Sequence, residues 1–262
     1  MNSDMTQELL KTGAMGKPQG ERHALKKEKH DDMPPVHHLA IIPDGNRRWA
    51  KERGLPSEEG HRTGLLDVSP AILRAAFARK IHTVTLWLFS TENWSRSKSE
   101  VDYLMEINQT FLQKMRSVAR EQKIRLAHLG RKDRIPGSLL KEILEAEEET
   151  KSHKNHHFNF AIDYGGRDEL IRAMQKLYRE ITDPEKINEE MVCRLLDTAG
   201  QEHTCPDIII RTSGEHRVSG FLPWQSDYSE LFFLEKHFPD FTELDLDLAL
   251  SVYQKRERRF GA

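Results

Sequence analysis

The sequence has few cysteines, no long hydrophobic run and almost no net charge, and each absence excludes a class of protein. Its two cysteines, Cys193 and Cys205, form no CxxC pair, so we interpret them as reduced structural thiols of a cytosolic protein. No apolar stretch approaches the ~18 residues of a membrane span, and no apolar signal segment precedes a cleavage site. We therefore expect a cytoplasmic protein whose contact with a membrane is at most peripheral.

The charge balance argues against a protein that is held to nucleic acid by bulk charge. Lys and Arg number 40 against 42 Asp and Glu, which gives a formal net charge of -2. The balance still allows a local basic pocket. The glycine-rich signatures GxxxxGK[ST] and GxGxxG are both missing, so the common nucleotide-binding cradles are absent as well.

The chain divides into a polar extension and one folded domain. Residues 1–34 have little apolar periodicity, so we expect a disordered extension there and a domain over residues 35–262. Short apolar runs typical of strands occur at 37–42, 82–89, 124–130, 157–163, 206–212 and 230–234. Helical patterns occur at 97–122, 138–151, 167–181, 189–199 and about 245–258. This alternation predicts an α/β fold with a mostly parallel sheet and helices on its faces.

Two local features carry their own expectations. Pro70 interrupts a helical pattern over about residues 60–80, so we expect a kink or a late helix start there. His153, His156 and His157 stand just before a strand, without a partner cysteine or a helical histidine pair. We therefore expect them in a surface loop rather than at a metal ion.

Polar residues collect where the strands end, which is where parallel sheets bind ligands. After the first strand, Asp44 is followed by a Gly45-Asn46 turn and a helix that opens with Arg47 and Arg48. Amide groups at a helix start, with arginines beside them, suit a diphosphate. An adjacent carboxylate suits Mg²⁺ that is shared with phosphate oxygens. Taken alone, the DGN sequence is equally consistent with an ordinary turn.

Two further loops follow later strands. Residues 90–96 offer hydroxyls, an amide, an indole and a guanidinium at one strand end. Residues 211–219 carry Arg211, Arg217 and Ser219 around a glycine turn. Because planar arginine forks bind phosphate oxygens in pairs, this loop is predicted to hold a second phosphate group.

Five motifs appear in order along the chain: IIPDGNRRWA, LFSTENWSR, SGEHRVSGF, YSELFF and RERRFG. With them the sequence resembles the cis-prenyltransferase (undecaprenyl diphosphate synthase) family over about residues 36–262. The resemblance implies an enzyme that condenses isopentenyl diphosphate with an allylic diphosphate, expected to be farnesyl diphosphate. The implied product is a Z-polyprenyl diphosphate, expected to be the undecaprenyl precursor of the cell-wall carrier lipid. A six-stranded parallel sheet, a hydrophobic tunnel, a homodimer and Mg²⁺ dependence are implied as well.

The resemblance also implies roles for individual residues. Asp44, Asn93 and Arg48 are expected to be catalytic, and Asp44 and Glu230 are expected to bind the metal, with His216 nearby. The expected substrate-binding residues are Gly45, Asn46, Arg47, Arg48, Trp49, His61, Ser90, Trp94, Arg96, Arg211, Arg217 and Ser219. Those from Gly45 to Arg48, with His61, surround the allylic diphosphate. The last four hold isopentenyl diphosphate. The Arg259–Gly261 element is expected to reach an active site across the dimer.

Two departures from the family pattern leave an alternative open. Ser57 stands where many long-chain members have an arginine, and Leu88 stands where many have a small tunnel-wall residue. A larger side chain at Leu88 would shorten the space for a growing lipid. The alternative is therefore a short-chain or irregular cis-prenyl diphosphate synthase. An inactive partner subunit is disfavoured, because Asp44, Arg48 and Arg211 are all present.

Overall fold

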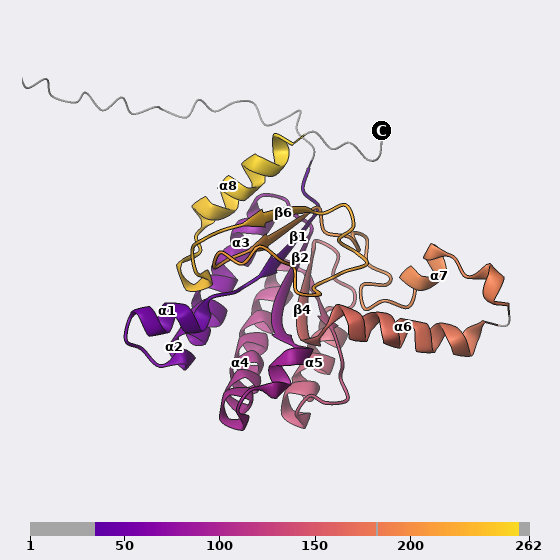
Figure 1. Cartoon of the computed structure of the whole chain (residues 1–262), viewed down its shortest axis with the longest axis horizontal. Helices are drawn as coiled ribbons and strands as arrows, with labels where there is room; N and C mark the ends of the chain where they lie inside the picture. Colours follow the sequence, from indigo (N-terminus) through magenta and orange to yellow (C-terminus); the bar gives the residue numbers. More distant parts are fainter. Residues whose placement is uncertain (1–34, 182, 257–262) are drawn as a thin grey trace, which may run out of the picture. The chain divides into compact units, whose positions relative to one another are not determined.

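Six parallel strands form one sheet, as the alternation of patterns predicted (Figure 1). The computed structural model describes residues 35–181 and 183–256, so the expected extension over 1–34 and the Arg259–Gly261 element lie outside the described residues. The strands are β1 (His38–Ile42), β2 (Thr83–Ser90), β3 (Ile124–Leu129), β4 (His156–Tyr164), β5 (Ile208–Arg211) and β6 (Glu230–Phe233). Their order is β3-β4-β2-β1-β5-β6, and every neighbouring pair is parallel.

Most helices lie where the apolar spacing predicted them. They are α1 (Asn46–Glu52), α2 (Ser57–Arg62), α3 (Ser69–Ala78), α4 (Lys98–Gln122), α5 (Gly137–Thr150), α6 (Gly166–Glu180), α7 (Glu189–Cys193) and α8 (Glu243–Gln254). Two predicted ends are wrong. The pattern over 189–199 stays helical only to Cys193, because the Asp197 amide donates to Glu169 Oε1 at 2.8 Å instead of to a helical carbonyl. The last helix ends at Gln254, four residues early.

The helix disruption predicted at Pro70 is confirmed and has a defined form. Residues Thr63–Val68, between α2 and α3, are π-helical, and Pro70 lies in the first turn of α3. The Ser69 hydroxyl donates to the Gly64 carbonyl oxygen at 2.9 Å, which satisfies a carbonyl at the change of helix type. Wide turns of this kind are frequent at functional sites. Gly64 and Ser69 both line the pocket described below.

The sheet is buried on both faces, as the near-continuous apolar strands predicted. One face packs on α3, α4, α5 and α8 through the larger apolar core. The other face carries a smaller cluster of Ala40, Ile42, Leu129, Ala161, Tyr164, Ile209, Phe221 and Leu222. No helix in the described part of the chain is long and apolar enough to cross a membrane.

On the face that carries the smaller cluster, the amino end of the sheet is polar. His38, Thr83 and His157 are in register on β1, β2 and β4, and all three are buried. The expected surface loop for His157 is therefore wrong. The His157 amide donates to the His82 carbonyl oxygen at 2.8 Å. Strand β4 therefore begins at His156, and both histidines belong to the sheet.

Candidate active site

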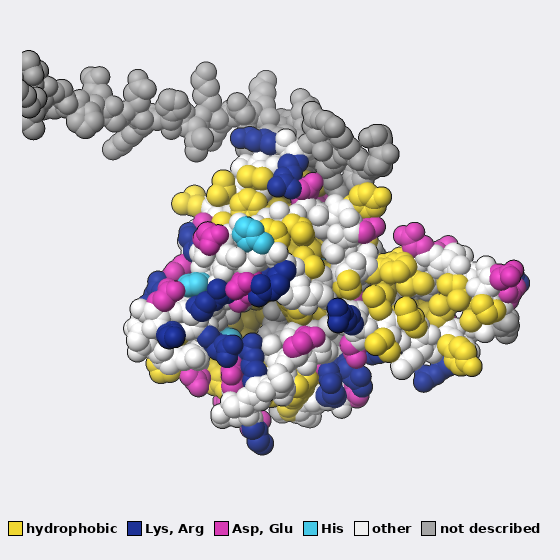
Figure 2. Space-filling view, in the orientation of Figure 1, with side chains coloured by type: hydrophobic (Ala, Val, Ile, Leu, Met, Phe, Trp, Pro, Cys, Tyr) yellow, Lys and Arg dark blue, Asp and Glu magenta, His cyan; other side chains and the backbone are white. Residues whose placement is uncertain are grey.

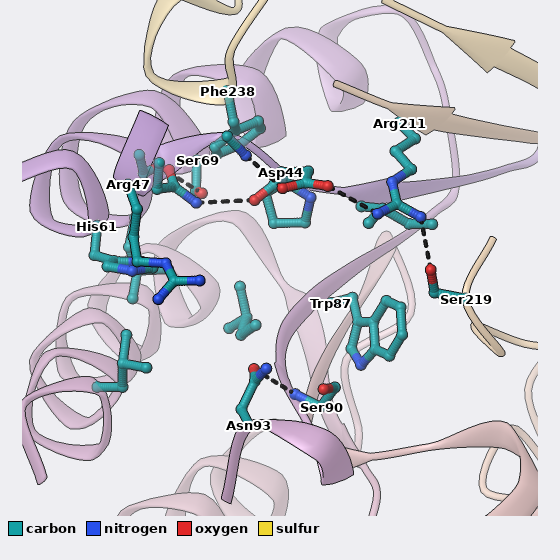
Figure 3. Close-up of a pocket in the computed structure, with 18 of the residues that line it drawn as sticks. Asp44, Arg47, His61, Ser69, Trp87, Ser90, Asn93, Arg211, Ser219 and Phe238 are labelled. Atoms are coloured by element: carbon teal, nitrogen blue, oxygen red, sulfur yellow. Dashed lines mark hydrogen bonds and ion pairs between the residues drawn. The ribbon is translucent and has the colours of Figure 1, made fainter. Parts of the chain in front are cut away.

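A pocket of about 540 Å³ opens beyond the carboxyl ends of β1, β2 and β5 (Figure 3). All three loops that the sequence singled out contribute to it. The predicted residues that line it are Asp44, Gly45, Asn46, Arg47, Arg48, His61, Ser90, Asn93, Arg96, Arg211, Arg217 and Ser219. The structure therefore brings together residues that are up to 175 positions apart in the chain, counted from Asp44 to Ser219.

Asp44 lies at the centre of the polar side of this pocket. Its Oδ2 accepts a hydrogen bond from Arg211 Nη2 at 2.8 Å, and its Oδ1 lies 3.5 Å from Arg48 Nη2. Burial by itself raises the pKa of the Asp44 carboxyl, but the hydrogen bond and charge of Arg211 outweigh it and hold the pKa below its usual value. Asp44 is therefore a carboxylate at neutral pH, the form that binds a metal ion.

The backbone around Asp44 is fixed by the strand beside it. The Thr212 hydroxyl accepts from the Asp44 amide at 2.9 Å and donates to the Asp44 carbonyl oxygen at 2.7 Å. Gly45 follows at a φ of 96°, and a Cβ there would lie 2.4 Å from Ser213 Oγ. Only glycine combines this left-handed φ with so close an approach. The turn sets the direction in which α1 and its arginines leave the sheet.

Arg211 joins the third loop to Asp44. Its side chain is buried, and its Nη1 donates to the Arg217 carbonyl oxygen at 2.5 Å and to Ser219 Oγ at 2.8 Å. Glu215, which the sequence analysis missed, lies 3.2 Å from Arg48 Nη1 and also pairs with Arg217. One acidic side chain thus holds together arginines from the first and third loops.

A second acidic residue likewise lies close to two arginines, on the other side of the pocket. Glu100 of α4 accepts from Arg96 at 2.8 Å and lies 3.7 Å from Arg47 Nη1. Ser90 and Asn93 form a capping box in which the Ser90 amide donates to Asn93 Oδ1 at 3.0 Å. This bond fixes the second loop opposite Asp44 (Figure 3).

His61 faces the pocket as a neutral side chain. Burial, followed by the positive charge of Arg96, lowers its pKa to about 4, so the imidazole is uncharged at neutral pH. Its buried Nε2 has no hydrogen-bond partner among the described residues. Buried polar atoms are rarely left unpaired, so a partner supplied by a ligand fits this position.

The remaining lining is largely apolar: Leu65, Trp87, Leu88, Leu104, Ile107 and Phe238. Trp87 is fixed by a hydrogen bond from its Nε1 to the Tyr164 carbonyl oxygen at 3.1 Å and by stacking on Phe221. The pocket therefore combines a cationic side with a hydrocarbon-like side. A molecule with a diphosphate head and an apolar chain matches that combination.

The comparisons with known proteins agree with this geometry. The family model described as putative undecaprenyl diphosphate synthase matches residues 42–261. An isoprenyl transferase of Lactococcus lactis is 40% identical over 239 residues, which cover 90% of this chain and 97% of the relative. The chain belongs to the cis-prenyltransferase (undecaprenyl diphosphate synthase) family. It is thus an isoprenyl transferase, an enzyme that condenses isopentenyl diphosphate with an allylic diphosphate.

Other cis-prenyltransferases that resemble the chain differ in their products. The ditrans,polycis-undecaprenyl-diphosphate synthase ((2E,6E)-farnesyl-diphosphate specific) of Legionella pneumophila is 41% identical, with 86% of this chain and 94% of the relative covered. The crystal structure of lavandulyl diphosphate synthase from Lavandula x intermedia, in complex with dimethylallyl diphosphate, is 38% identical with a TM-score of 0.84. It covers 87% of this chain and 98% of that one.

Four predicted residues lie outside the pocket lining of this cis-prenyltransferase: Trp49, Trp94, His216 and Glu230. Trp49 Nε1 donates to Asp240 at 2.8 Å, and Trp94 Nε1 donates to Asp163 at 2.8 Å. Both indoles fix loops beside the site rather than facing into it. His216, expected near the metal, stacks on an aromatic ring of β6.

Glu230 is not brought to Asp44 within this chain. It begins β6, at the amino end, and forms an ion pair with Arg256. Phe233, three residues after Glu230, is the residue of β6 that is in register with Arg211 of β5 beside the pocket. At about 3.3 Å per residue, Glu230 starts roughly 10 Å away along the strand. The prediction that Asp44 and Glu230 share one metal ion is therefore not met within the described chain.

The donor set at Asp44 nevertheless fits Mg²⁺. This ion is commonly held by one or two carboxylates together with substrate phosphates and water. Asp44 offers one ionised carboxylate at the edge of a pocket with cationic walls. Such an ion would take most of its ligands from a bound diphosphate.

Proposed function

We propose that this cis-prenyltransferase extends farnesyl diphosphate with isopentenyl diphosphate to a long Z-polyprenyl diphosphate, a carrier-lipid precursor. One observation carries the proposal: the guanidinium groups of Arg48 and Arg211 flank Asp44 in a pocket whose other wall is apolar. Asn46, Arg47, Arg48 and His61 are assigned to the allylic diphosphate. Arg96, Arg211, Arg217 and Ser219 are assigned to the diphosphate of the homoallylic substrate.

The chemistry follows from holding the two diphosphates separately. The bond between the allylic carbon and its diphosphate breaks, the double bond of isopentenyl diphosphate attacks that carbon, and a proton is then lost. Arg48 stabilises the negative charge that develops on the departing diphosphate. Mg²⁺ bound by Asp44 and the diphosphate oxygens would neutralise more of that charge. Clamping both substrates also removes the entropy cost of their encounter. Asn93 orients the homoallylic partner from the opposite loop.

A short-chain or irregular condensation is the second candidate, and one observation favours it. Leu88 lines the pocket beside Trp87, so two large side chains reduce the space for a lipid chain along the apolar wall. The test is to incubate the full chain with Mg²⁺, isopentenyl diphosphate and farnesyl diphosphate, and then separate the dephosphorylated lipids by length. A ladder that ends in long Z-chains supports the carrier-lipid proposal. A single short or branched product supports the second candidate.

Replacing Leu88 with alanine is expected to lengthen the product. Removing most of an isobutyl group enlarges the space in the pocket next to Trp87, so a longer lipid chain fits before the product is released. The measurement is the chain-length distribution of extracted lipid for the wild type and the variant. Leu140→Ala is the matched control, because Leu140 is partly buried on α5 and does not line the pocket. An unchanged distribution in Leu88→Ala would contradict a tunnel-wall role.

We also propose that the enzyme works as a homodimer that touches the membrane peripherally when its apolar product leaves. Helix α6 exposes Ile171, Met174 and Tyr178, with 55%, 64% and 84% of their surface accessible. Their spacing places them on one face of the helix. Figure 2 shows apolar side chains gathered over α6 and α7. Contiguous apolar patches of this kind mark interaction sites on soluble proteins.

The double substitution Met174→Asp with Tyr178→Asp is expected to give a monomer. Two buried, unpaired carboxylates would oppose association strongly. Light scattering should give twice 30.5 kDa for the wild type and 30.5 kDa for the variant. Leu244→Asp, at an exposed leucine of α8, is the matched control and should stay dimeric. A wild-type monomer, or a variant that remains dimeric, would contradict this surface as the interface.

A further inference from the structure

Histidines gather at the amino end of the sheet, away from the Asp44 pocket. His37 and His38 lie at the start of β1, His82 precedes β2, His157 lies at the start of β4, and His203 lies in the loop before β5. Strand β1 has five residues, so at about 3.3 Å per residue its ends are roughly 13 Å apart. This cluster is thus separated from the catalytic edge by the length of the sheet.

Two histidines of this cluster meet Glu202 in the manner of metal ligands. One ligand atom each from His82, Glu202 and His203 lies within 4.8 Å of the other two. Glu202 Oε2 is 3.8 Å from His82 Nε2, and Glu202 Oε1 is 3.7 Å from His203 Nε2. Within residues 35–181 and 183–256, this is the one group of three or more such side chains that is so close.

The three ligand atoms would move closer together to hold an ion. Zinc–nitrogen bonds of about 2.0–2.1 Å place tetrahedral ligand atoms roughly 3.3–3.5 Å apart. The His82 and His203 side chains are partly buried, with 22% and 25% of their surface exposed, whereas 72% of the Glu202 side chain is exposed. Closing the group to these distances takes a movement of the exposed carboxylate and a smaller approach of the two imidazoles, whose ligand atoms already lie within 4.8 Å of each other.

The surroundings prepare both imidazoles for ligation. His82 Nδ1 lies 2.9 Å from Thr83 Oγ1, so its Nε2 is the nitrogen that faces Glu202. Such an outer hydrogen bond is the usual device that orients a metal-binding histidine. His37 stacks on His203 with ring centres 4.6 Å apart.

We propose that His82, Glu202 and His203 bind one first-row transition-metal ion of the Zn²⁺ class, with water completing the coordination. Two imidazoles with one carboxylate select Zn²⁺ over Mg²⁺, which prefers oxygen ligands. The ion joins the loop that leads into β5 to the start of β2. It therefore fastens two segments that are more than a hundred residues apart in the chain. Its role is structural and separate from condensation at Asp44.

Metal binding to the full chain tests this site directly. Protein stripped with a chelator and dialysed is titrated with Zn²⁺ against a chromophoric indicator, and with Co²⁺ for the visible absorption of a tetrahedral site. The wild type is expected to bind one ion. His203→Ala and Glu202→Gln should each bind that ion with an affinity at least about tenfold weaker. Zn²⁺ should also raise the melting temperature of the wild type but of neither variant.

Matched variants separate this site from other histidines and from Asp44. His153→Ala removes a histidine that binds the Ile124 carbonyl oxygen instead, and Asp44→Asn alters the catalytic edge. Both should bind Zn²⁺ as the wild type does. Because Glu202 is exposed, Glu202→Gln should fold normally, which circular dichroism verifies. A wild type without a bound ion, or equal affinity in His203→Ala, Glu202→Gln and the wild type, would overturn the proposal.

Discussion

Replacing Asp44 with asparagine is expected to lower kcat by roughly a thousandfold, the scale seen when one preorganised electrostatic group is lost from an active site. Asparagine keeps an oxygen acceptor for the hydrogen bond from Arg211, so the loop geometry should survive. What disappears is the negative charge that would hold Mg²⁺ against the diphosphate. The loss should therefore fall on turnover at saturating substrates. Steady-state kinetics at several Mg²⁺ concentrations measures it.

The control for Asp44→Asn is Asp133→Asn. Asp133 is also a carboxylate paired with an arginine, Arg131, but it is exposed and does not line the pocket. Its kcat should stay within about twofold of the wild type, as surface substitutions are mild. If Asp44→Asn retained more than a tenth of wild-type kcat, the assignment of Asp44 to the metal and leaving group would be wrong.

Replacing Arg211 with lysine is expected to lower kcat/KM for isopentenyl diphosphate by about a hundredfold, since each 1.4 kcal/mol is tenfold and charge-assisted hydrogen bonds carry about 1.5–3 kcal/mol. The Arg211 fork reaches Asp44, Ser219 and the backbone of the third loop at the same time. A lysine ammonium is a single point of charge and cannot span those three acceptors. Most of the change should appear in KM for the homoallylic substrate.

The comparison variant is Arg131→Lys, which alters an arginine that also contacts two carboxylates but lies outside the pocket. It should leave both kinetic constants near wild type. Equal effects of the two substitutions would point to a general loss of stability. A change confined to the allylic substrate in Arg211→Lys would place the two diphosphates the other way round.

The sheet and the polar edge were predictable because local sequence signals and tertiary structure agree there. The apolar strands could be buried on both faces only with helices on each side. The loop after β1 needs a glycine beside Ser213, and the sequence supplies Gly45 at that position. Because carboxyl ends of parallel strands share one edge, Asp44 and Arg211 were expected together, and they form an ion pair.

Other features depend on contacts that no local pattern encodes. Glu100 and Glu215 resemble ordinary surface acids in sequence, yet each pairs with arginines from two elements of the site. Glu230 lies in a family motif, but the register of β6 places it at the far end of the strand from the pocket. Trp49 sits beside the arginines of α1, yet its indole turns to Asp240.

The polar amino end of the sheet was missed for a similar reason. His82, His157 and His203 are scattered in sequence and meet only after the strands align. Periodicity predicts which face of a strand is buried, but it cannot tell which strands lie side by side.

The central claim is that two diphosphates bind on either side of Asp44 in one pocket. The most direct measurement is a crystal structure of the full chain with Mg²⁺, isopentenyl diphosphate and an unreactive thiolo analogue of farnesyl diphosphate. We predict one diphosphate at Asn46, Arg48 and His61, the other at Arg211 and Ser219, and the metal on Asp44. Both hydrocarbon chains should face the apolar wall. Diphosphates bound elsewhere, or a single site that both ligands share, would contradict the account.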